Sequence, residues 1–341
     1  MGRDVARLPK AHLHLHFTGS MRPSTLKDLA ASTGIRLPES LREQHMIHLT
    51  PDERGWFRFQ RLYDAARACV RDEAAMRRMV LEAAADDAAE GSGWLELQVD
   101  PTSYAPFVGG ITPALEIVLD AAREASALTS TQVAVVVAAS RIRHPLDART
   151  LARLAARYAG RGPGQVVGFG LSNDERRGAT EDFAPAFRIA RAAGLACLPH
   201  SGELLGPDHI EVTLAALHPD RLGHGVRAAE DPRLLERLAA AGVALEVCPT
   251  SNISLGVYPD ADDVPLRTLV GAGARIALGA DDPLLFGPRL AAQYELARRQ
   301  GFDDAALADL ARGSIRASRA PDDVRARLLA GVDAWLAAPG D

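Results

Sequence analysis

Residues 11–16 read Ala-His-Leu-His-Leu-His, and this stretch decides the first strand of the predicted fold. Side chains two positions apart on a β-strand share a face, so His12, His14 and His16 point one way and the two leucines point the other. In a closed barrel of strands, the imidazoles would lie inside and the leucines would pack against the surrounding helices. The plainer interpretation is a half-polar strand without a functional role, and His12, which lies deepest, fits a structural role best.

Seven more short apolar runs follow, alternating with segments of helical periodicity. The eight predicted strands are residues 11–16, 93–99, 132–139, 165–170, 194–199, 220–224, 242–247 and 275–279. Segments 184–193 and 232–241 repeat apolar residues at i, i+3 and i+4, as amphipathic helices do. Gly194, Gly242 and Gly273 stand where a helix should end before the next strand. This alternation predicts the α/β class and a single (β/α)8 barrel of the TIM type, whose active site lies at the C-terminal ends of the strands.

The connection over residues 17–92 is far longer than one crossover requires. We therefore expect extra helices between strands 1 and 2 that form a lid over the mouth of the barrel. Because the chain shows no internal repeat, low-complexity tract or linker, residues 1–341 are predicted to form one domain.

Composition narrows the functional class. The net charge is −5 without any basic run, which argues against nucleic-acid and membrane-surface partners. No stretch approaches the ~18 apolar residues of a membrane span, and a first strand at Ala11 leaves no room for a signal peptide. Cys69, Cys197 and Cys248 form no C-x-x-C pair and are odd in number, which favours free thiols in a reducing compartment. We expect a cytoplasmic enzyme for a small molecule, and a homo-oligomer is compatible with the sequence.

Ionisable residues stand at the C-terminal ends of strands one, five, six and eight. The last three of these strands end in Pro199-His200-Ser201-Gly202-Glu203, Arg221-Leu222-Gly223-His224-Gly225 and Gly279-Ala280-Asp281-Asp282-Pro283. Taken singly, such a histidine is typical of a hydrogen-bonded loop, and Asp-Asp-Pro is typical of a turn or helix cap. Taken together, two imidazoles from one strand, a third from another strand and a carboxylate can hold Zn²⁺ and leave a position for water. The metal lowers the pKa of that water from 15.7 to about 7, and a histidine and a glutamate remain for acid–base catalysis.

The same residues closely resemble the adenosine deaminase family of the amidohydrolase superfamily. The resemblance covers nearly the whole chain and is carried by Leu8-Pro9-Lys10, His14-Leu15-His16, His200-Ser201-Gly202-Glu203, Arg221-Leu222-Gly223-His224-Gly225, Cys248-Pro249-Thr250-Ser251-Asn252 and Asp281-Asp282-Pro283. It implies one Zn²⁺ per subunit, with four ligands: His14, His16, His200 and Asp281.

The resemblance also implies the catalytic roles. Glu203 would protonate N1 of the purine, and His224 would orient or deprotonate the water that attacks C6. Asp282 would hydrogen-bond N7, and His16, Thr18 and Asn173 would complete the substrate contacts. The reaction implied is hydrolytic deamination of adenosine or 2′-deoxyadenosine to inosine or 2′-deoxyinosine, with release of ammonia.

Lysine usage bears on the number of metals. Binuclear members of the superfamily bridge two metals with a carboxylated lysine from the fourth strand, but this chain has no lysine after Lys27. We therefore expect a single catalytic metal.

Two departures from the family pattern concern the substrate. Adenosine-specific members have Asp where this chain has Thr18, and that Asp accepts a hydrogen bond from the ribose 5′-hydroxyl. Loss of this charged acceptor would weaken the contact with the 5′-hydroxyl by ~1.5–3 kcal/mol. Alternatively, it would make room for a 5′ substituent. Asn173 stands where the family has a glycine whose backbone meets the purine N3 region.

Three alternatives follow. The substrate could be adenine, or a 5′-modified adenine nucleoside such as aminodeoxyfutalosine, with the same chemistry. A noncatalytic nucleoside-binding protein is disfavoured because every ligand and Glu203 are present. A cytidine-type zinc deaminase is excluded because Cys248 lacks the P-C-x-x-C partner.

The remaining polar and aromatic residues receive structural interpretations. Arg143 and His144 are interpreted as braces of a loop rather than as substrate contacts. The aromatic residues Trp56, Phe57 and Phe59 either line the lid or pack on the barrel rim. Four further histidines are assigned to the surface: His45, His48, His209 and His218.

Overall fold

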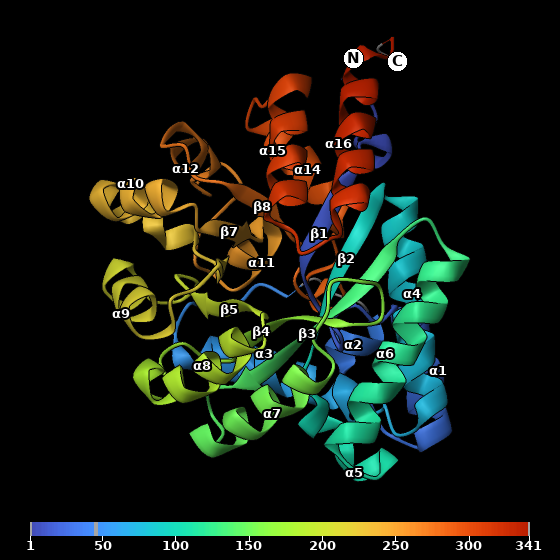
Figure 1. Cartoon of the computed structure of the whole chain (residues 1–341). Helices are drawn as coiled ribbons and strands as arrows, with labels where there is room; N and C mark the ends of the chain where they lie inside the picture. The colour runs from blue at the N-terminus through green and yellow to red at the C-terminus, as the bar shows by residue number, and fades with distance from the viewer. Residues whose placement is uncertain (1, 44–46, 340–341) are drawn as a thin grey trace.

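The structure is a computed structural model and describes residues 2–43 and 47–339. Eight parallel strands are hydrogen-bonded in chain order and curl into a nearly closed barrel (Figure 1). The strands are β1 (Lys10–His16), β2 (Ser92–Val99), β3 (Gln132–Ser140), β4 (Val166–Ser172), β5 (Ala196–Ser201), β6 (Arg221–His224), β7 (Ala244–Val247) and β8 (Ile276–Leu278). All eight predicted strands are confirmed, and the predicted fold class with them.

The barrel closes through a residue that follows the last strand. Asp281 donates its backbone N–H to the carbonyl of His14 and accepts from the N–H of His16, both at 3.0 Å. The seam between β1 and β8 therefore consists of candidate site residues.

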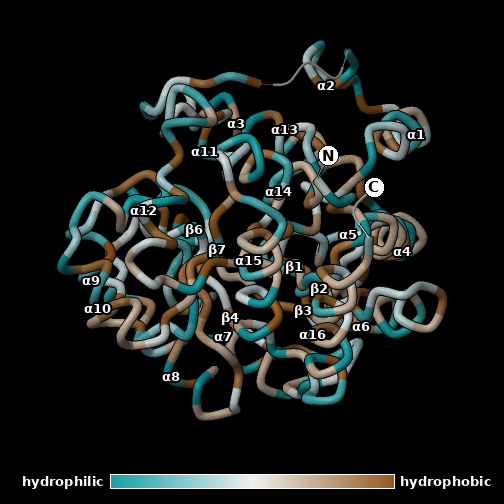
Figure 2. The backbone as a smooth tube through the Cα atoms, turned by 90° about the horizontal axis from the view of Figure 1, so that it is seen from above, coloured by the Kyte–Doolittle hydropathy of each residue, from teal (hydrophilic) through white to brown (hydrophobic). Residues whose placement is uncertain are grey.

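Helices surround the strands, as the view from above shows (Figure 2). They are α1 (Pro23–Thr33), α2 (Glu39–Glu43), α3 (Glu53–Arg67), α4 (Glu73–Ala89), α5 (Ala105–Val108), α6 (Ile111–Leu128), α7 (Pro145–Arg157), α8 (Ala184–Ala192), α9 (Pro207–Leu217), α10 (Pro232–Ala241), α11 (Pro249–Ser254), α12 (Leu266–Gly271), α13 (Pro283–Phe286), α14 (Leu290–Arg299), α15 (Asp304–Ala317) and α16 (Asp322–Ala337). Within the described ranges, no helix is both long and apolar enough to cross a membrane.

Helix α10 illustrates how local sequence sets these boundaries. The Asp231 side chain accepts hydrogen bonds from the first-turn N–H groups of Arg233 and Leu234, and a proline occupies the first helical position. The helix buries Leu234, Leu235 and Leu238 and ends at Gly242, whose φ of 70° suits a residue without Cβ. The predicted helix over residues 232–241 is thus confirmed.

The long connection between β1 and β2 contains α1 to α4, which confirms the predicted extra helices. Helix α4 packs against β2 and α6 and is an ordinary member of the outer ring. Helix α3 instead lies over the mouth of the barrel, where Trp56, Phe59 and Gln60 line a pocket. The lid is therefore built chiefly from α3.

Candidate metal centre and active site

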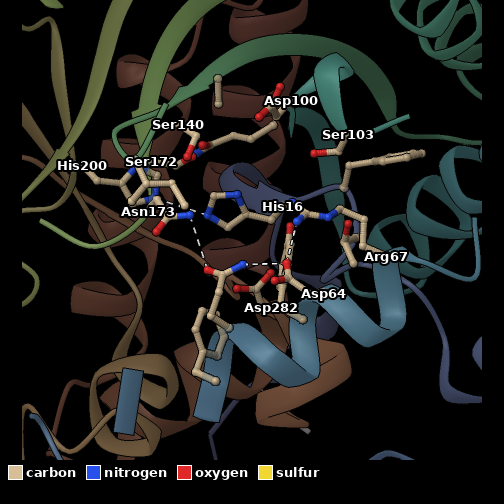
Figure 3. A pocket seen from close by; sticks show the side chains of 18 of the residues that line it. His16, Asp64, Arg67, Asp100, Ser103, Ser140, Ser172, Asn173, His200 and Asp282 are labelled. Atoms are coloured by element: carbon tan, nitrogen blue, oxygen red, sulfur yellow. Dashed lines mark hydrogen bonds and ion pairs between the residues drawn. The ribbon is translucent and has the colours of Figure 1, made fainter. Parts of the chain in front are cut away.

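One pocket opens at the C-terminal ends of the strands, between the barrel and α3 (Figure 3). Its floor contains His16, His200, Asp281 and Asp282, together with Glu203 and His224. Its outer half contains Asp64 and Arg67 from α3, and Asp100 and Ser103 from the segment after β2. The structure therefore brings together residues that are nearly 270 positions apart in the chain.

Four predicted ligands gather around a common point. The Asp281 Oδ1 atom lies 3.2 Å from His16 Nε2 and 3.6 Å from His14 Nε2. The Nε2 atoms of His16 and His200 are 3.2 Å apart. Ligands about 2.0–2.2 Å from one tetrahedral centre lie about 3.3–3.6 Å from each other, so these spacings suit a single Zn²⁺-sized cation.

The electrostatics of this point also suit a cation. Burial lowers the pKa of His14, but Asp281 and Glu246 outweigh that effect and raise it to about 10. The His14 Nε2 atom, although buried, has no hydrogen-bond partner among the described residues. A divalent cation would satisfy both the orphaned nitrogen and the local excess of negative charge.

A buried chain of charges orients His14 from below. Its Nδ1 atom lies 2.8 Å from Glu246 Oε2, and Glu246 Oε1 accepts from Arg221 Nε at 2.6 Å. Arg221 also donates to Glu96 at 2.5 Å. Burial alone would raise the pKa of Glu246, but Arg221 and His14 hold it below its usual range. This carboxylate fixes the ring so that Nε2 faces the metal position, as such partners do in metal sites.

Backbone strain is concentrated at the same place. Four non-glycine residues in the described ranges have positive φ, and three of them are site residues: Asn173 at 81°, His224 at 64° and Asp281 at 62°. Such conformations persist only where the surrounding structure imposes them, and they cluster at functional sites. Asn173 therefore keeps the left-handed backbone expected of the glycine that it replaces.

Glu203 and His224 face each other beside the candidate ligands. The His224 Nε2 atom lies 3.5 Å from Glu203 Oε1 and 3.9 Å from Asp281 Oδ2. Burial, followed by the charges of Asp281 and Glu175, raises the pKa of Glu203 well above its usual value. Burial, followed by His14, lowers the pKa of His224 to about 3. A protonated carboxyl beside a neutral imidazole is the pairing that acid–base catalysis requires.

Asp282 is a second buried carboxyl in the pocket. Burial and the charge of Asp281 raise its pKa well above the usual value, so this group favours the protonated form that can donate a hydrogen bond. It packs directly on Gly19, where an added Cβ would come within 1.8 Å of the Asp282 Oδ1 atom. Glycine is needed at that position to admit the carboxyl.

Thr18 and Asn173, which are predicted to contact the substrate, both line the pocket. The Thr18 hydroxyl is buried and lies 2.5 Å from the Tyr104 hydroxyl. The Asn173 side chain receives the N–H of Asp174 at 2.8 Å and donates to Gln60 of α3 at 3.4 Å (Figure 3).

Several structural interpretations can now be judged. His12 is structural as predicted, because its ring nitrogens bond Asp87 and the N–H of Ala280. His144 does brace a loop, since its Nδ1 accepts from the N–H of Leu146 at the start of α7. Arg143, in contrast, lines the pocket.

The three aromatic residues Trp56, Phe57 and Phe59 do not share one environment. Trp56 and Phe59 line the pocket, whereas Phe57 is 62% exposed.

Of the four histidines assigned to the surface, His48 and His218 are exposed, and His45 lies outside the described residues. The assignment of His209 is wrong. Its ring is only 14% exposed and bonds Ser201 and Thr180. Helix α9 turns this position towards Ser201 of β5, and the helical pattern of the sequence alone does not reveal that orientation.

Sequence reasoning missed the residues that hold the site in place. Glu96 and Glu246 are single acids within otherwise apolar strands, and that isolation is a signal of a polar barrel interior that could have been used. Arg141 and Glu175 follow strands β3 and β4, and no sequence signal distinguishes them from ordinary loop charges. Both are nevertheless buried, at 2% exposure each.

Comparisons with known proteins agree with this geometry. A sequence model of the adenosine deaminase family matches residues 9–335. A Streptomyces virginiae protein provisionally named adenosine/adenine deaminase is 64% identical over 337 residues, covering 98% of both chains.

Two crystal structures share the fold. Adenine deaminase from Arthrobacter aurescens superposes with a TM-score of 0.88 at 30% identity, covering 97% of this chain and 99% of that chain. An amidohydrolase from Burkholderia ambifaria, solved with bound zinc, superposes with a TM-score of 0.84 at 25% identity and covers 98% of this chain and 94% of its own.

Proposed function

The chain belongs to the adenosine deaminase family, and from that premise we propose that it hydrolyses adenosine or 2′-deoxyadenosine at C6, yielding the 6-oxopurine nucleoside and ammonia. The observation that carries the proposal is the convergence of three imidazoles and a carboxylate at one end of the barrel, beside an acid–base pair. Residues 1–341 would act as one catalytic domain.

His14, His16, His200 and Asp281 would hold one Zn²⁺, as their spacing and the zinc content of the Burkholderia relative support. Bound there, the metal supplies Lewis acidity that brings the pKa of water to about 7. Burial lowers the pKa of His200 well below its usual value, which keeps this imidazole neutral, as ligation requires.

The protein side chains divide the remaining work. Glu203 donates a proton to N1, which makes C6 electrophilic, and His224 orients the attacking water and takes its proton. Asp282 in its protonated form donates to N7, and the backbone N–H of Asn173 meets the N3 edge. Water adds at C6, and the proton that His224 took is passed to the amino group, which leaves as ammonia. The remaining hydroxyl proton restores Glu203 as the C6 carbonyl forms. Each positioned acid or base typically contributes ~10²–10⁴ in rate.

The outer half of the pocket supports a nucleoside rather than a free base. Asp64, Arg67, Asp100, Ser103 and Arg143 line the same pocket as the candidate metal and acid–base residues. Asp64 and Arg67 already pair with each other and Asp100 accepts from Thr102, but adenine has no hydroxyl groups to add to these contacts. A sugar would engage them.

A second candidate is an adenine nucleoside with an anionic group at its 5′ end, a class that includes aminodeoxyfutalosine. Thr18 supports it, because the Thr18 hydroxyl is already engaged by Tyr104 and no carboxylate stands there to accept from a 5′-hydroxyl. Arg143 supports it as well. Its guanidinium is exposed at the pocket wall and makes none of the hydrogen bonds or ion pairs found within the described ranges.

A substrate panel tests both candidates. The kcat/KM of the zinc-loaded protein should be measured for adenosine, 2′-deoxyadenosine, 5′-deoxyadenosine, adenosine 5′-monophosphate and adenine. We expect the two free nucleosides to be the best substrates. A preference for the 5′-monophosphate that is lost in Arg143→Gln would favour the second candidate, and a preference for adenine would overturn both. No turnover of any member would refute the deaminase assignment.

A further inference from the structure

The loop that carries Glu203 is held by a carboxylate from the turn after β4. Glu175 lies in the turn after β4, and its Oε2 atom accepts three backbone hydrogen bonds. The donors are the consecutive N–H groups of Glu203 at 3.1 Å, Leu204 at 2.6 Å and Leu205 at 2.8 Å. Consecutive backbone N–H groups that converge in this way form an anion-binding nest, here filled by a side chain of the same protein.

The Glu175 carboxylate is fully enclosed. Its side chain has no exposed surface, and His209 Nδ1 lies 3.7 Å from its other oxygen, Oε1. That second oxygen has no hydrogen-bond partner among the described residues. Glu175 therefore directs its hydrogen bonding to a single target, the chain at residues 203–205.

Two arginines hold the carbonyl side of the same segment. Arg141 donates to the carbonyl of His200 at 2.6 Å and to the Thr180 hydroxyl at 3.0 Å. Arg227 donates to the carbonyl of Leu204 at 2.5 Å. Residues 200–205 are therefore held through their N–H groups by the carboxylate of Glu175 and through their carbonyl groups by the guanidinium groups of Arg141 and Arg227.

We propose that Glu175 is a positioning residue for the reaction: its carboxylate grips residues 203–205 and so sets the Glu203 carboxyl against N1 of the purine. This inference rests on the proposed function. Glu175 stands two residues after Asn173, so one short turn both presents a backbone N–H to the purine and fixes the acid that protonates it. The two groups that would meet N1 and N3, which flank C2 of the purine, thereby share one support.

A displacement of about 1 Å at a catalytic group can cost about 100-fold in rate. Glu175→Asp shortens the side chain by one methylene and withdraws the carboxylate from its three donors, while the substituted residue stays small enough to fit. Glu175→Gln keeps the length and one acceptor oxygen but removes the charge. Glu175→Leu removes the acceptor altogether. The matched controls are the same three changes at Glu181, an exposed acid later in the same connection between β4 and α8.

The assay compares kcat and KM for adenosine with those for 6-chloropurine riboside, at equal zinc content. Chloride leaves without a proton, and the chlorine already makes C6 electron-poor, so this substrate depends less on the acid at N1. We expect Glu175→Asp to lower kcat for adenosine about 10- to 100-fold with KM changed less than about threefold. The loss on the chloro substrate should be smaller, Glu175→Gln should restore most of the rate, and the Glu181 variants should match the unaltered protein.

Two results would overturn the inference. One is a folded, zinc-containing Glu175→Asp protein with undiminished kcat, and the other is an equal loss on both substrates, which would indicate general disruption. If Glu175→Leu does not fold, the Asp and Gln variants alone test whether Glu175 positions Glu203. An unaltered protein that turns over neither substrate would instead refute the proposed function, so the two failures are distinguishable.

Discussion

The floor of the pocket and its outer half are built differently. On the floor, His14 is fully enclosed and Glu203 is 3% exposed; His14 is held by Glu246 of β7, and Glu203 by Glu175 of the turn after β4. In the outer half, the side chains of Asp64 and Arg67 are 49% and 31% exposed and bond mainly to each other, within one turn of α3. The floor is supported from the barrel, whereas the Asp64–Arg67 pair of the outer half belongs to the lid helix α3.

This difference separates chemistry from selection. Groups that act on the reacting atoms must be fixed before the substrate arrives, and burial among fixed dipoles strengthens their electrostatic effect. Groups that recognise the remote end of a substrate can remain solvated and adapt. Changes on the floor should therefore alter kcat strongly, and changes in the outer half should alter substrate preference modestly.

The largest effect is expected at Glu203. Replacing it with glutamine keeps the size but removes the proton that N1 needs, so kcat should fall by ~10²–10⁴ while KM changes little. Steady-state rates with adenosine, together with zinc content and thermal stability, check this. A variant with more than about a tenth of the original kcat would show that Glu203 is not the acid. It would also contradict the expectation that changes on the floor strongly alter kcat.

The next largest effect concerns the support of the metal ligands. Glu246→Gln removes the negative charge that faces His14 and Arg221, so zinc affinity should fall by about 10- to 100-fold. Competition with a chelator measures the affinity, and added zinc should restore much of the activity. Glu236→Gln, at an exposed position of α10, is the matched control. Unchanged zinc affinity in Glu246→Gln would mean that the metal ligands do not depend on the buried charges of Glu246 and Arg221.

The same contrast explains which parts of the molecule the sequence could predict. The eight strands were predictable from their apolar runs, and alternation with the meeting of strand ends indicated that His14 and His16 could join other polar residues at one end of the barrel. The particular ligand set and acid–base pair were implied by the resemblance to the adenosine deaminase family. The structure brings the predicted ligands and the predicted acid–base pair together at that end. Their roles as ligands and catalysts stay predictions until the experiments above are done.

The supporting contacts could not be predicted to the same degree. Glu175 reaches residues 203–205 only because two loops fold against each other, and His209 is buried only because of the orientation of α9. Such contacts depend on tertiary packing between segments that carry no shared pattern. The position of α3 over the mouth was predictable as a lid, but its contacts with the pocket were not.

The next prediction concerns substrate preference at Thr18, whose side chain is buried against Tyr104, and the change is Thr18→Asp. Asp is close to Thr in volume and would give a 5′-hydroxyl a charged acceptor, so the preference for adenosine over 5′-deoxyadenosine should rise about tenfold, in line with hydrogen bonds to charged groups. The neutral variant Thr18→Asn is the control. Turnover of adenosine 5′-monophosphate should fall in the Asp variant because like charges repel. An unchanged substrate ratio would indicate that Thr18 lies away from the 5′ end.

The smallest effect is expected where the lid meets the barrel. Gln60 of α3 accepts from the Asn173 side chain at 3.4 Å, a long hydrogen bond, and donates to Asp64 at 2.8 Å. Because a weak, partly solvated contact contributes about 0.5–1 kcal/mol, Gln60→Ala should raise the KM for adenosine only about two- to fivefold and leave kcat unchanged. Arg58→Ala, an exposed change on the same helix, should leave both constants unaltered. A fall of tenfold or more in kcat for Gln60→Ala would mean that closure of α3 takes part in the chemical step, and the separation between a catalytic floor and a selective outer half would then have to be abandoned.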